Sequence, residues 1–500
     1  MPCDRCLPKS EANQFYEAAT SIPPGNAEFF QILHVPIEVP FDFGVSSAYI
    51  TKIYLSVEYF AERVFIMLNI GIAEEIITPP RGITLAGYFN RRPNRGMYDD
   101  TKVRAVVFEK DGTVAGLVVL DVCTIGAELF SRILDGIAAE GLDFGKNLIV
   151  CANHTHTGTG QSSAIRDEAV EPTAAKTVSA VVRAWRNLAP GEIEFASVEK
   201  NPCAFVRRYW MKDGSVATNP GKLNPDIVGP ESDFDRKVNV IAFKQEERII
   251  ALAVNLANHG DTIGGDLVSA DWMGRLEREL QIAIGEDVMV MTPMNASGDI
   301  NHFDVSTARG QTSYAEAKRI GREYGQVVME ALKSLRPVVF DQIVVKNSDF
   351  RYYSRTVSAE KLAEARRILA ETDSGAVHGD LTSEGLVGGD PAVLRHFARR
   401  IVDCAEKSVS FRTCRLTAIE FDRELALISL PGEPFNGISR AIQAKSPFRY
   451  TVVIELAQSQ AAYTPMPECF ERGGYETMPG VDTSAEDNAP RMITAALENL

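Results

Sequence analysis

The chain of 500 residues lacks an excess of positive charge, a long apolar run and a leader-like N-terminus. Its 52 basic and 67 acidic residues give a formal charge of −15 without any basic patch, so binding to nucleic acid is not expected. No segment reaches the ~18 consecutive apolar residues of a transmembrane helix, because Glu74 and Glu75 interrupt the most apolar stretch. The start of the chain shows no basic segment followed by an apolar core, which predicts a cytoplasmic protein.

Cysteine is sparse and irregularly placed. The eight cysteines are scattered along a long chain, several of them inside apolar runs, which predicts reduced thiols rather than a disulfide framework. Cys3 and Cys6 form one Cys-x-x-Cys pair, without a second such pair or a nearby pair of histidines. A zinc knuckle at this position is therefore not expected.

Residues 1–66 differ from the rest of the chain. They show no clean periodicity, and regular patterning begins at Met67. We expect residues 1–66 to be an N-terminal extension, or the translation of sequence upstream of a gene that begins at Met67. A native terminus at Met1, found by N-terminal sequencing, would contradict the second alternative. Residues 67–500 are then expected to form the functional domain.

Beyond Met67, apolar β-rich runs alternate with amphipathic helical stretches. Strands are predicted at 103–108, 114–122, 147–153, 249–258, 288–293, 416–421, 425–430 and 450–456. Helices are predicted at 178–188, 273–283, 320–335, 358–370 and 391–405, with Pro172 in the first turn of the first helix. No internal repeat is visible. This order predicts a mixed α/β (α+β) protein, with helices flanking one or two buried, partly parallel sheets.

Polar segments directly follow four of the strand-like runs, at 152–160, 257–265, 295–302 and 430–435. Strand ends are where sheet proteins place ligand sites, because the strand fixes the backbone and the loop presents side chains. Histidine is scarce, yet three of these segments hold four of the seven histidines: His154, His156, His259 and His302. We therefore expect these segments to form the functional site.

The residue types in these segments suit zinc, which binds imidazole nitrogen and carboxylate oxygen. Residues two apart on an extended strand face the same side, so His154 and His156 are expected to point together. A catalytic zinc needs about three protein ligands, and His154, His259 and Glu433 could supply them. Each histidine alone could equally be structural. Glu433 is harder to explain without a ligand, because its loop follows a very apolar strand.

Other polar residues favour simpler roles. Asp271 is expected to cap a helix, and Asp299, after a glycine, could close a turn. His396 and His378 are expected at the surface, and His34 lies in the segment 1–66.

Five short motifs occur in a fixed order along the chain. They are His-Thr-His-Thr-Gly from His154, His-Gly-Asp-Thr from His259, Gly-Asp-Ile-Asn from Gly298, Pro-Gly-Glu from Pro431 and Tyr-Thr-Pro from Tyr463. Together they resemble the neutral, non-lysosomal ceramidase family. The resemblance spans roughly Asn69 to Gly480 and includes the stretch 207–214, which looks like the Asn-Arg-Arg region of a bacterial subgroup.

The resemblance implies a zinc-dependent amidase with the ion at the floor of a pocket. Carried over by motif, the ligands of Zn²⁺ are His154, His259, Glu433 and Tyr463. His156 then lies beside the ion, where it contacts substrate or exchanges a proton. Tyr463 either binds the metal or donates to the developing oxyanion.

Two further catalytic residues are predicted from the same resemblance. Asp299 belongs to the Gly-Asp-Ile-Asn motif. Arg208, or its neighbour Arg207, is expected to orient the polar end of a substrate, although adjacent arginines on a loop are often merely solvated.

The chain also departs from the family. Asn301 stands where the ceramidases carry a serine, and Ser297 lies on the other side of Gly298, so a serine-based step is not expected. The family's signal peptide and C-terminal β-sandwich domain have no counterpart in the sequence. A soluble acyl amide or ester is therefore as good a candidate substrate as ceramide or another lipid. A metal-dependent esterase or deacylase acting on an acylated sugar, and a catalytically silent binding protein, stay open as alternatives, as does the oligomeric state.

Overall fold

A computed structural model describes residues 68–160, 166–372, 380–382, 384–407, 411–459, 461–478 and 485–500. The chain divides into two units, Met1–Arg63 and Val64–Leu500, and every described residue belongs to the second. The predicted extension at 1–66 lies outside the described residues, together with its Cys-x-x-Cys pair and His34, and so does His378.

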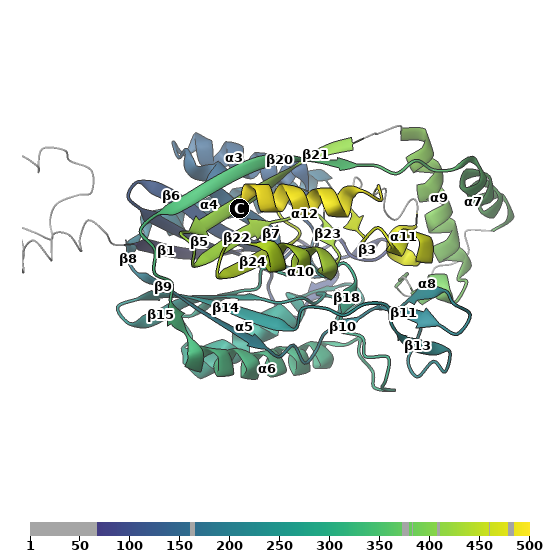
Figure 1. Cartoon of the computed structure of the whole chain (residues 1–500), viewed down its shortest axis with the longest axis horizontal. Helices are drawn as coiled ribbons and strands as arrows, with labels where there is room; N and C mark the ends of the chain where they lie inside the picture. The colour runs from purple at the N-terminus through teal and green to yellow at the C-terminus, as the bar shows by residue number, and fades with distance from the viewer. Residues whose placement is uncertain are drawn as a thin grey trace, which may run out of the picture. The chain divides into compact units, whose positions relative to one another are not determined.

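Three large mixed sheets build the second unit (Figure 1). The first has the spatial order β7 (Leu148–Ala152), β6 (Thr113–Leu120), β5 (Lys102–Lys110), β1 (Asn69–Ile76) and β8 (Ala189–Pro190). The second has the order β17 (Met289–Met291), β15 (Arg248–Asn255), β14 (Lys237–Gln245), β9 (Glu192–Glu199) and β19 (Arg336–Pro337). The third has the order β20 (Ile343–Tyr353), β21 (Phe411–Phe421), β22 (Leu425–Ser429) and β24 (Tyr450–Ile454).

The three sheets share one order of elements. In each, three antiparallel strands are followed by a helix and then by a strand parallel to the third, as in β6–β7, β15–β17 and β22–β24. A second helix follows later in the chain. The helix pairs are α3 (Ala127–Ala139) with α4 (Arg166–Arg186), α5 (Asp271–Ile284) with α6 (Tyr314–Ala331), and α10 (Asn436–Lys445) with α12 (Asn488–Asn499). This repeat is absent from the sequence because it is one of element order, not of residue identity.

Each sheet also carries an insertion between its first and second strands. The first insertion holds β2 (Thr84–Leu85), β3 (Arg92–Pro93) and β4 (Gly96–Met97); the second holds β10 (Phe205–Val206), β11 (Arg208–Met211), β12 (Val216–Thr218) and β13 (Ile227–Pro230); the third holds α7 (Ala359–Glu371), α8 (Glu384–Val387) and α9 (Pro391–Lys407). Because the first three strands are antiparallel, each insertion leaves from the edge at which the third and fourth strands end. Insertions and strand-end loops therefore share one edge of every sheet.

The remaining elements are short. They are β16 (Leu267–Val268), β18 (Ile300–Asn301), β23 (Glu433–Pro434), β25 (Tyr463–Thr464), α11 (Cys469–Arg472) and the 3-10 turns Phe144–Asn147, Leu332–Ser334 and Tyr475–Thr477. None of the helices in the described part combines the length and the apolar character needed to cross a membrane.

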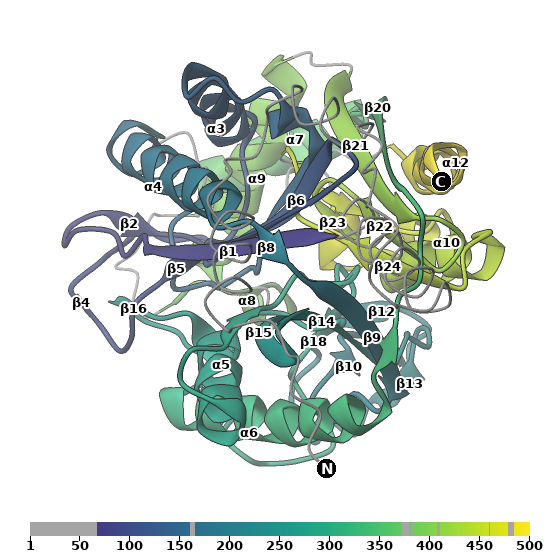
Figure 2. The ribbon, with the colours of Figure 1, turned by 90° about the vertical axis from the view of Figure 1, so that its left-hand side faces the viewer.

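The inner faces of the three sheets pack on one another in a shared apolar core. Phe108 of β5 meets Phe421 of β21 with ring centroids 5.5 Å apart, and Phe195 of β9 meets Tyr450 of β24 at 4.3 Å. The helix pairs cover the outer faces, as the end-on view shows (Figure 2). Strands buried on both faces consist of nearly continuous apolar runs, which is why the sequence predicts them.

The predicted fold class is confirmed, and each strand and helix predicted from residue 103 onward has a counterpart. The number of sheets is a correction, since three large sheets replace the one or two expected. Pro172 is a second correction, because α4 begins at Arg166 and Pro172 lies inside the helix. The predicted cap at Asp271 is a third correction. Asp271 is the first residue of α5, with φ of 54°, and Ala270 occupies the N-cap position.

Candidate metal centre

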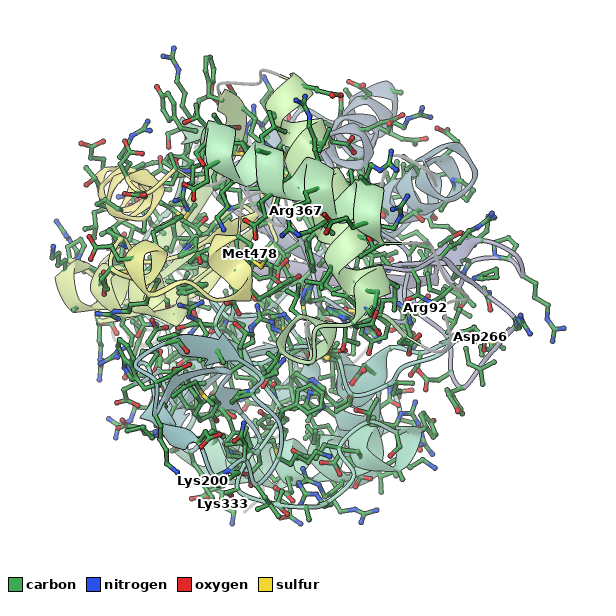
Figure 3. The ribbon with its side chains drawn as sticks, turned by 90° about the vertical axis from the view of Figure 1, so that its right-hand side faces the viewer. Arg92, Lys200, Asp266, Lys333, Arg367 and Met478 are labelled. Atoms are coloured by element: carbon green, nitrogen blue, oxygen red, sulfur yellow. The ribbon has the colours of Figure 1, made fainter. Side chains whose placement is uncertain are left out.

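The predicted metal ligands lie on loops that leave the three sheets at their shared edge. His154 follows β7, His259 follows β15 and Glu433 follows β22. The parallel strands of a sheet end at the same edge, so the loops after them can meet there. The third insertion, α7 to α9, lies at the same end of the unit. Figure 3 looks onto that end, with Met478 and Arg92 labelled on either side of these helices.

Backbone contacts join the loops in pairs. Thr155 forms a parallel bridge with Gly260, and the N–H of His156 donates to the carbonyl of Gly260 at 2.8 Å. This pairing sets His154 beside His259. In the third sheet, β23 runs parallel to β25 with Glu433 in register with Tyr463. Two sequence-distant predicted ligands are thereby neighbours.

Two glycines make this close approach possible. A Cβ atom at Gly260 would lie 2.7 Å from the carbonyl oxygen of His154, and one at Gly298 would lie 2.3 Å from that of Glu433. Both distances are shorter than non-bonded contact allows, so any larger residue would push the ligand loops apart.

The three ligand side chains converge on one point. The Oε2 atom of Glu433 is 3.3 Å from Nε2 of His154 and 3.4 Å from Nε2 of His259, and all three ligand atoms lie within 4.8 Å of one another. A tetrahedral zinc ion with bonds of about 2.1 Å places neighbouring ligand atoms about 3.4 Å apart. The spacing of the side chains therefore fits a zinc ion.

The orientation of His154 is fixed by its surroundings. Its Nδ1 lies 2.8 Å from the carbonyl oxygen of Cys123, so Nδ1 carries the proton and Nε2 is free to bind a metal. His154 has φ of 66°, a left-handed conformation that is rare outside glycine and clusters at functional sites. The argument from an extended strand is thus wrong: β7 ends at Ala152, and His154 and His156 meet across a turn.

Burial and mutual contact shift the pKa values of the cluster. Burial alone would raise the pKa of Glu433, but the two imidazoles lower it well below its usual range. Burial would lower the pKa of His154, yet the Glu433 carboxylate raises it. Burial, followed by His154 and Arg207, lowers the pKa of His259 to about 3. Ionised Glu433 and neutral His259 are in the forms that bind metals, whereas the raised pKa of His154 means that this residue loses a proton when a metal binds.

The hydrogen bonding of Glu433 also favours a cation. Its buried Oε2 atom accepts no well-formed hydrogen bond from the described residues, although it faces two imidazole nitrogens. A buried carboxylate oxygen without a donor is costly unless a cation compensates it. The donor set of two imidazoles and one carboxylate is one that catalytic zinc sites use.

His156 lies at the edge of the cluster. Its Nε2 is 3.3 Å from Nε2 of His154, but its ring centroid is 5.8 Å from that of His259. It falls outside the compact set of His154, His259 and Glu433 and groups instead with His154 and Cys123. This placement favours a role beside the metal.

Tyr463 and Arg207 complete the side of the cluster opposite the histidine loop. The guanidinium carbon of Arg207 is 5.0 Å from the ring centroid of Tyr463, and its Nη1 lies 3.3 Å from Nε2 of His259. Arg207 also donates to the carbonyl of Gly298 at 2.6 Å and pairs with Glu476 at 2.8 Å. A cation and a phenol thus lie together beside the loop of Glu433.

Arg208 points elsewhere. It is fully buried and pairs with Glu231 at 2.5 Å and with Glu476 at 2.7 Å. Of the two arginines that the sequence leaves open, the structure brings Arg207 to the cluster, while Arg208 reaches it only through Glu476, which both arginines bind.

The polar side chains of the Gly-Asp-Ile-Asn segment bind neighbouring parts of the chain. Asp299 accepts a hydrogen bond of 2.7 Å from the first N–H of α10, at Asn436, and burial raises its pKa to about 6. The amide of Asn301 donates to Asn219 at 2.9 Å. The hydroxyl of Ser297 donates to the carbonyl of Asn295 and accepts from the N–H of Asn258. Neither Ser297 nor Asn301 is thus presented as a nucleophile.

Sequence reasoning missed two residues of the site. Asp261 lies 3.3 Å from Nδ1 of His156, and the hydroxyl of Tyr88 donates to Asp261 at 2.6 Å. Asp261 follows His259 within the predicted polar segment, which is a usable signal. Tyr88 comes from the first insertion, far away in sequence, and no local pattern links it to the site.

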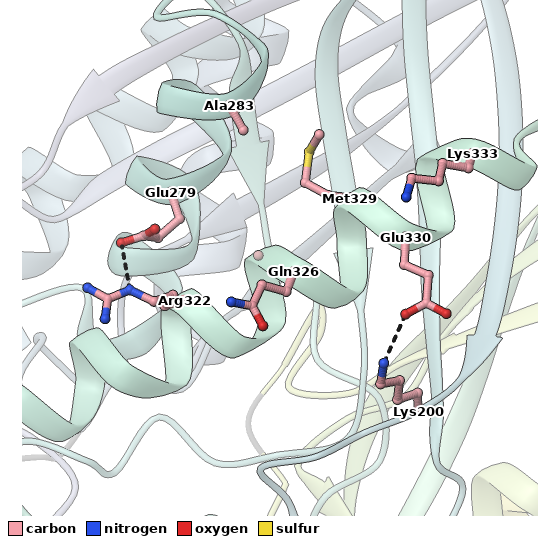
Figure 4. A pocket seen from close by; sticks show the side chains of 9 residues that line it. Lys200, Glu279, Ala283, Arg322, Gln326, Met329, Glu330 and Lys333 are labelled. Carbon is pink, nitrogen blue, oxygen red and sulfur yellow. Dashed lines mark hydrogen bonds and ion pairs between the residues drawn. The ribbon is translucent and has the colours of Figure 1, made fainter.

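Two other features do not belong to the predicted metal set. His396, expected at the surface, stacks on Phe89 with ring centroids 5.0 Å apart. A surface pocket of about 730 Å³ lies between α5 and α6 and is bordered by the ion pairs Arg322–Glu279 and Lys200–Glu330 (Figure 4). It contains none of the predicted site residues.

Neither a protein-family model nor a curated protein sequence matches this chain. Two solved structures share its fold. Neutral ceramidase from Pseudomonas aeruginosa superimposes with a TM-score of 0.66 and 16% identity, over 87% of this chain and 74% of that one. A structure named "Ceramidase complexed with C2" gives a TM-score of 0.66 and 15% identity, over 87% and 75% of the two chains. The chain therefore has the fold of neutral ceramidase.

Proposed function

We propose that this protein is a zinc-dependent hydrolase that cleaves an N-acyl amide, ceramide or a related N-acyl compound. The observation that carries the proposal is the convergence of His154, His259 and Glu433 within 4.8 Å, on the fold of neutral ceramidase. Tyr463, in register with Glu433, is the proposed fourth ligand. The Oε2 atom of Glu433 is buried without a well-formed hydrogen bond, and a cation bound between it and the two imidazoles would compensate its charge.

Each nearby side chain has a distinct task in this proposal. A zinc ion held by these residues supplies Lewis-acid activation of water and of the substrate carbonyl. His156 accepts a proton from the attacking water and returns it to the leaving nitrogen. Arg207, or the phenol of Tyr463 if it does not bind metal, donates to the carbonyl oxygen as negative charge develops there.

Arg208 and Asp299 act through other residues and do not themselves contact the substrate in this proposal. Arg208 and Arg207 share the carboxylate of Glu476, so Arg208 fixes the position of the arginine that faces the substrate. Asp299 binds the start of α10, directly after the loop that carries Glu433. Both are proposed to hold the site in place.

The test joins metal analysis to activity. The purified full chain should contain at least half an equivalent of zinc and should hydrolyse a short-chain ceramide faster than a matched acyl ester or an acetylated sugar. Faster turnover of the ester or the sugar would replace the amide by that substrate class. Zinc below half an equivalent, with no turnover of any of the three, would favour a silent binding protein.

Two variants separate ligand from proton carrier. His259→Ala should lose zinc and activity together. His156→Ala should keep zinc and lose turnover by about 10²- to 10⁴-fold, the usual contribution of a general acid–base residue. The control is His396→Ala, which removes a histidine stacked on Phe89 and should leave the zinc content unchanged. Equal loss of zinc in the first two variants would make His156 a ligand.

A further inference from the structure

Asp261 and Tyr88 form a chain of side chains that ends at the imidazole of His156. We propose that Asp261 is a positioning residue that fixes the ring orientation and tautomer of His156, and that Tyr88 holds Asp261 in place. This inference rests on the proposed function, because it names the partner of the proton-transfer residue.

The contacts run from one aromatic side chain to the other through a single oxygen atom. The Oδ1 atom of Asp261 lies 3.3 Å from Nδ1 of His156 and accepts a hydrogen bond of 2.6 Å from the hydroxyl of Tyr88. The two rings meet edge to face, with centroids 5.5 Å apart. The contact with Tyr88 is a hydrogen bond, whereas the contact with His156 is a close approach without well-formed hydrogen-bond geometry, so Asp261 is held by Tyr88 with its carboxylate beside the imidazole.

The position of Asp261 selects one tautomer of His156. An ionised carboxylate only accepts hydrogen bonds, so its position 3.3 Å from Nδ1 favours the tautomer of a neutral His156 that carries the proton on Nδ1. The lone pair is then on Nε2, which faces the cluster 3.3 Å from Nε2 of His154. This is the arrangement in which His156 can accept a proton from a group at the metal.

Hydrogen bonds already fix the main chain of His156, so only the orientation of its ring is left for Asp261 to determine. Its N–H donates to Gly260 at 2.8 Å, and its carbonyl accepts from Nη2 of Arg92 at 2.6 Å. The guanidinium carbon of Arg92 also lies 4.1 Å from the ring centroid of Tyr88. Gly87, with φ of 99°, lets this loop approach, because a Cβ there would lie 2.4 Å from Cγ of His156.

A comparison with Asp271 shows that Asp261 does not serve the fold of its own loop. The carboxylate of Asp271 accepts from the backbone N–H groups of Thr262, Ile263 and Trp272. Within the described part of the chain, Asp261 binds side chains only. One aspartate therefore shapes the loop, while the other is directed at His156.

A double-mutant cycle tests the inference on zinc-loaded protein, with the para-nitroanilide of a short fatty acid as the probe. Asp261→Ala should lower kcat by about 30- to 100-fold, with KM and zinc content within twofold of wild type, since general acid–base catalysis depends on geometry. In the His156→Ala background the same change should lower kcat by less than twofold. Equal losses in both backgrounds, or loss of zinc, would overturn the inference.

Graded variants separate positioning from simple destabilisation. Asp261→Asn keeps an accepting oxygen and should recover part of the activity, with a loss of about tenfold. Tyr88→Phe removes only the hydroxyl and should lose less than Asp261→Ala. The matched control is Asp266→Asn, which removes a carboxylate from the same loop, where it pairs with the exposed Arg95, and should leave kcat unchanged.

A spectroscopic measurement decides the inference apart from the proposed function. Long-range nitrogen–proton NMR of histidine-labelled protein, assigned with His156→Ala, should show His156 protonated at Nδ1. Asp261→Ala should alter that signal. A proton on Nε2 of His156 would overturn the inference even if the enzyme is active. Absence of hydrolysis by wild type would overturn the proposed function and leave the tautomer as the deciding result.

Discussion

Two buried clusters of charge lie near the same strand ends and differ in how their charges are compensated. In the first, Arg104 of β5 binds Asp121 at 2.9 Å and Glu277 of α5 at 2.6 Å. Asp121 also accepts from the amide of Asn153 at 2.6 Å. In the second, the Oε2 atom of Glu433 faces imidazole nitrogens at 3.3 and 3.4 Å without a well-formed hydrogen bond.

The difference separates a structural cluster from the one that we propose to be functional. The Arg104 cluster is complete and ties the first sheet to a helix of the second. The Glu433 cluster is incomplete, because the Oε2 atom of Glu433 has close neighbours but no well-formed hydrogen bond. Burial alone does not distinguish the two clusters, but the state of their hydrogen bonding does.

Breaking the complete cluster should have the largest effect on stability. Arg104→Met leaves Asp121 buried without a cation and Glu277 with Lys102 alone, at 3.5 Å, and should lower the free energy of unfolding by about 3 to 5 kcal/mol. Urea unfolding in the presence of a chelator measures the change.

The control for this change is Arg132→Met. Arg132 forms exposed pairs with Glu128 and Glu171, which should contribute little to stability because solvent screens them. Equal effects of the two substitutions would show that the Arg104 cluster is no more than a set of surface-like ion pairs.

Breaking the incomplete cluster should weaken zinc binding more than it lowers the stability of the metal-free protein. Glu433→Gln should change the free energy of unfolding by less than about 1 kcal/mol in chelator, because His154 can lose its proton near neutral pH. Wild type should gain about 2.7 kcal/mol when free zinc is 100-fold above its Kd, and the variant should gain little. Zinc titration during thermal unfolding measures both. A full zinc-dependent gain in Glu433→Gln would contradict its role as a ligand.

Much of this comparison could be predicted from the sequence. The apolar runs at 148–152 and 425–429 form buried strands because both faces of each sheet are covered, and the polar residues just beyond them mark the strand ends. The three ligand residues stand out because histidine is scarce and Glu433 follows an apolar strand. Local patterns were enough to place each ligand at the end of its own strand.

The remainder depends on contacts between distant segments. The register of Glu433 with Tyr463 and the bridge between Thr155 and Gly260 involve different loops, and no local pattern contains them. The strands β9, β14 and β20 are missed by the analysis of apolar runs, and β1 is indicated only by the family's opening strand, which the resemblance places within 71–88. The choice between Arg207 and Arg208 depends on the direction in which each side chain leaves the insertion.

Asp299 lies between the two kinds of cluster and gives the smallest expected effect. Its carboxylate has one strong donor, the N–H of Asn436 at 2.7 Å, and burial raises its pKa from 3.8 to about 6. The folded state then binds a proton more tightly than the unfolded state, so its stability should fall as pH rises from about 4 to about 6. At 1.36 kcal/mol per unit of pKa, the free energy of unfolding should fall by about 1 to 3 kcal/mol.

Asp299→Asn keeps the accepting oxygen and removes the titration. The free energy of unfolding of wild type, relative to this variant, should therefore decline across that pH window, with chelator present in both samples. The control is Asp233→Asn, at an exposed aspartate that pairs with Arg236. The free energy of unfolding of wild type relative to this control variant should show no decline across the window. Parallel curves for wild type and Asp299→Asn would mean that hydrogen bonds already compensate the burial of the carboxylate. Loss of activity in Asp299→Asn at every pH, with stability unchanged, would instead support the catalytic role that its motif implies.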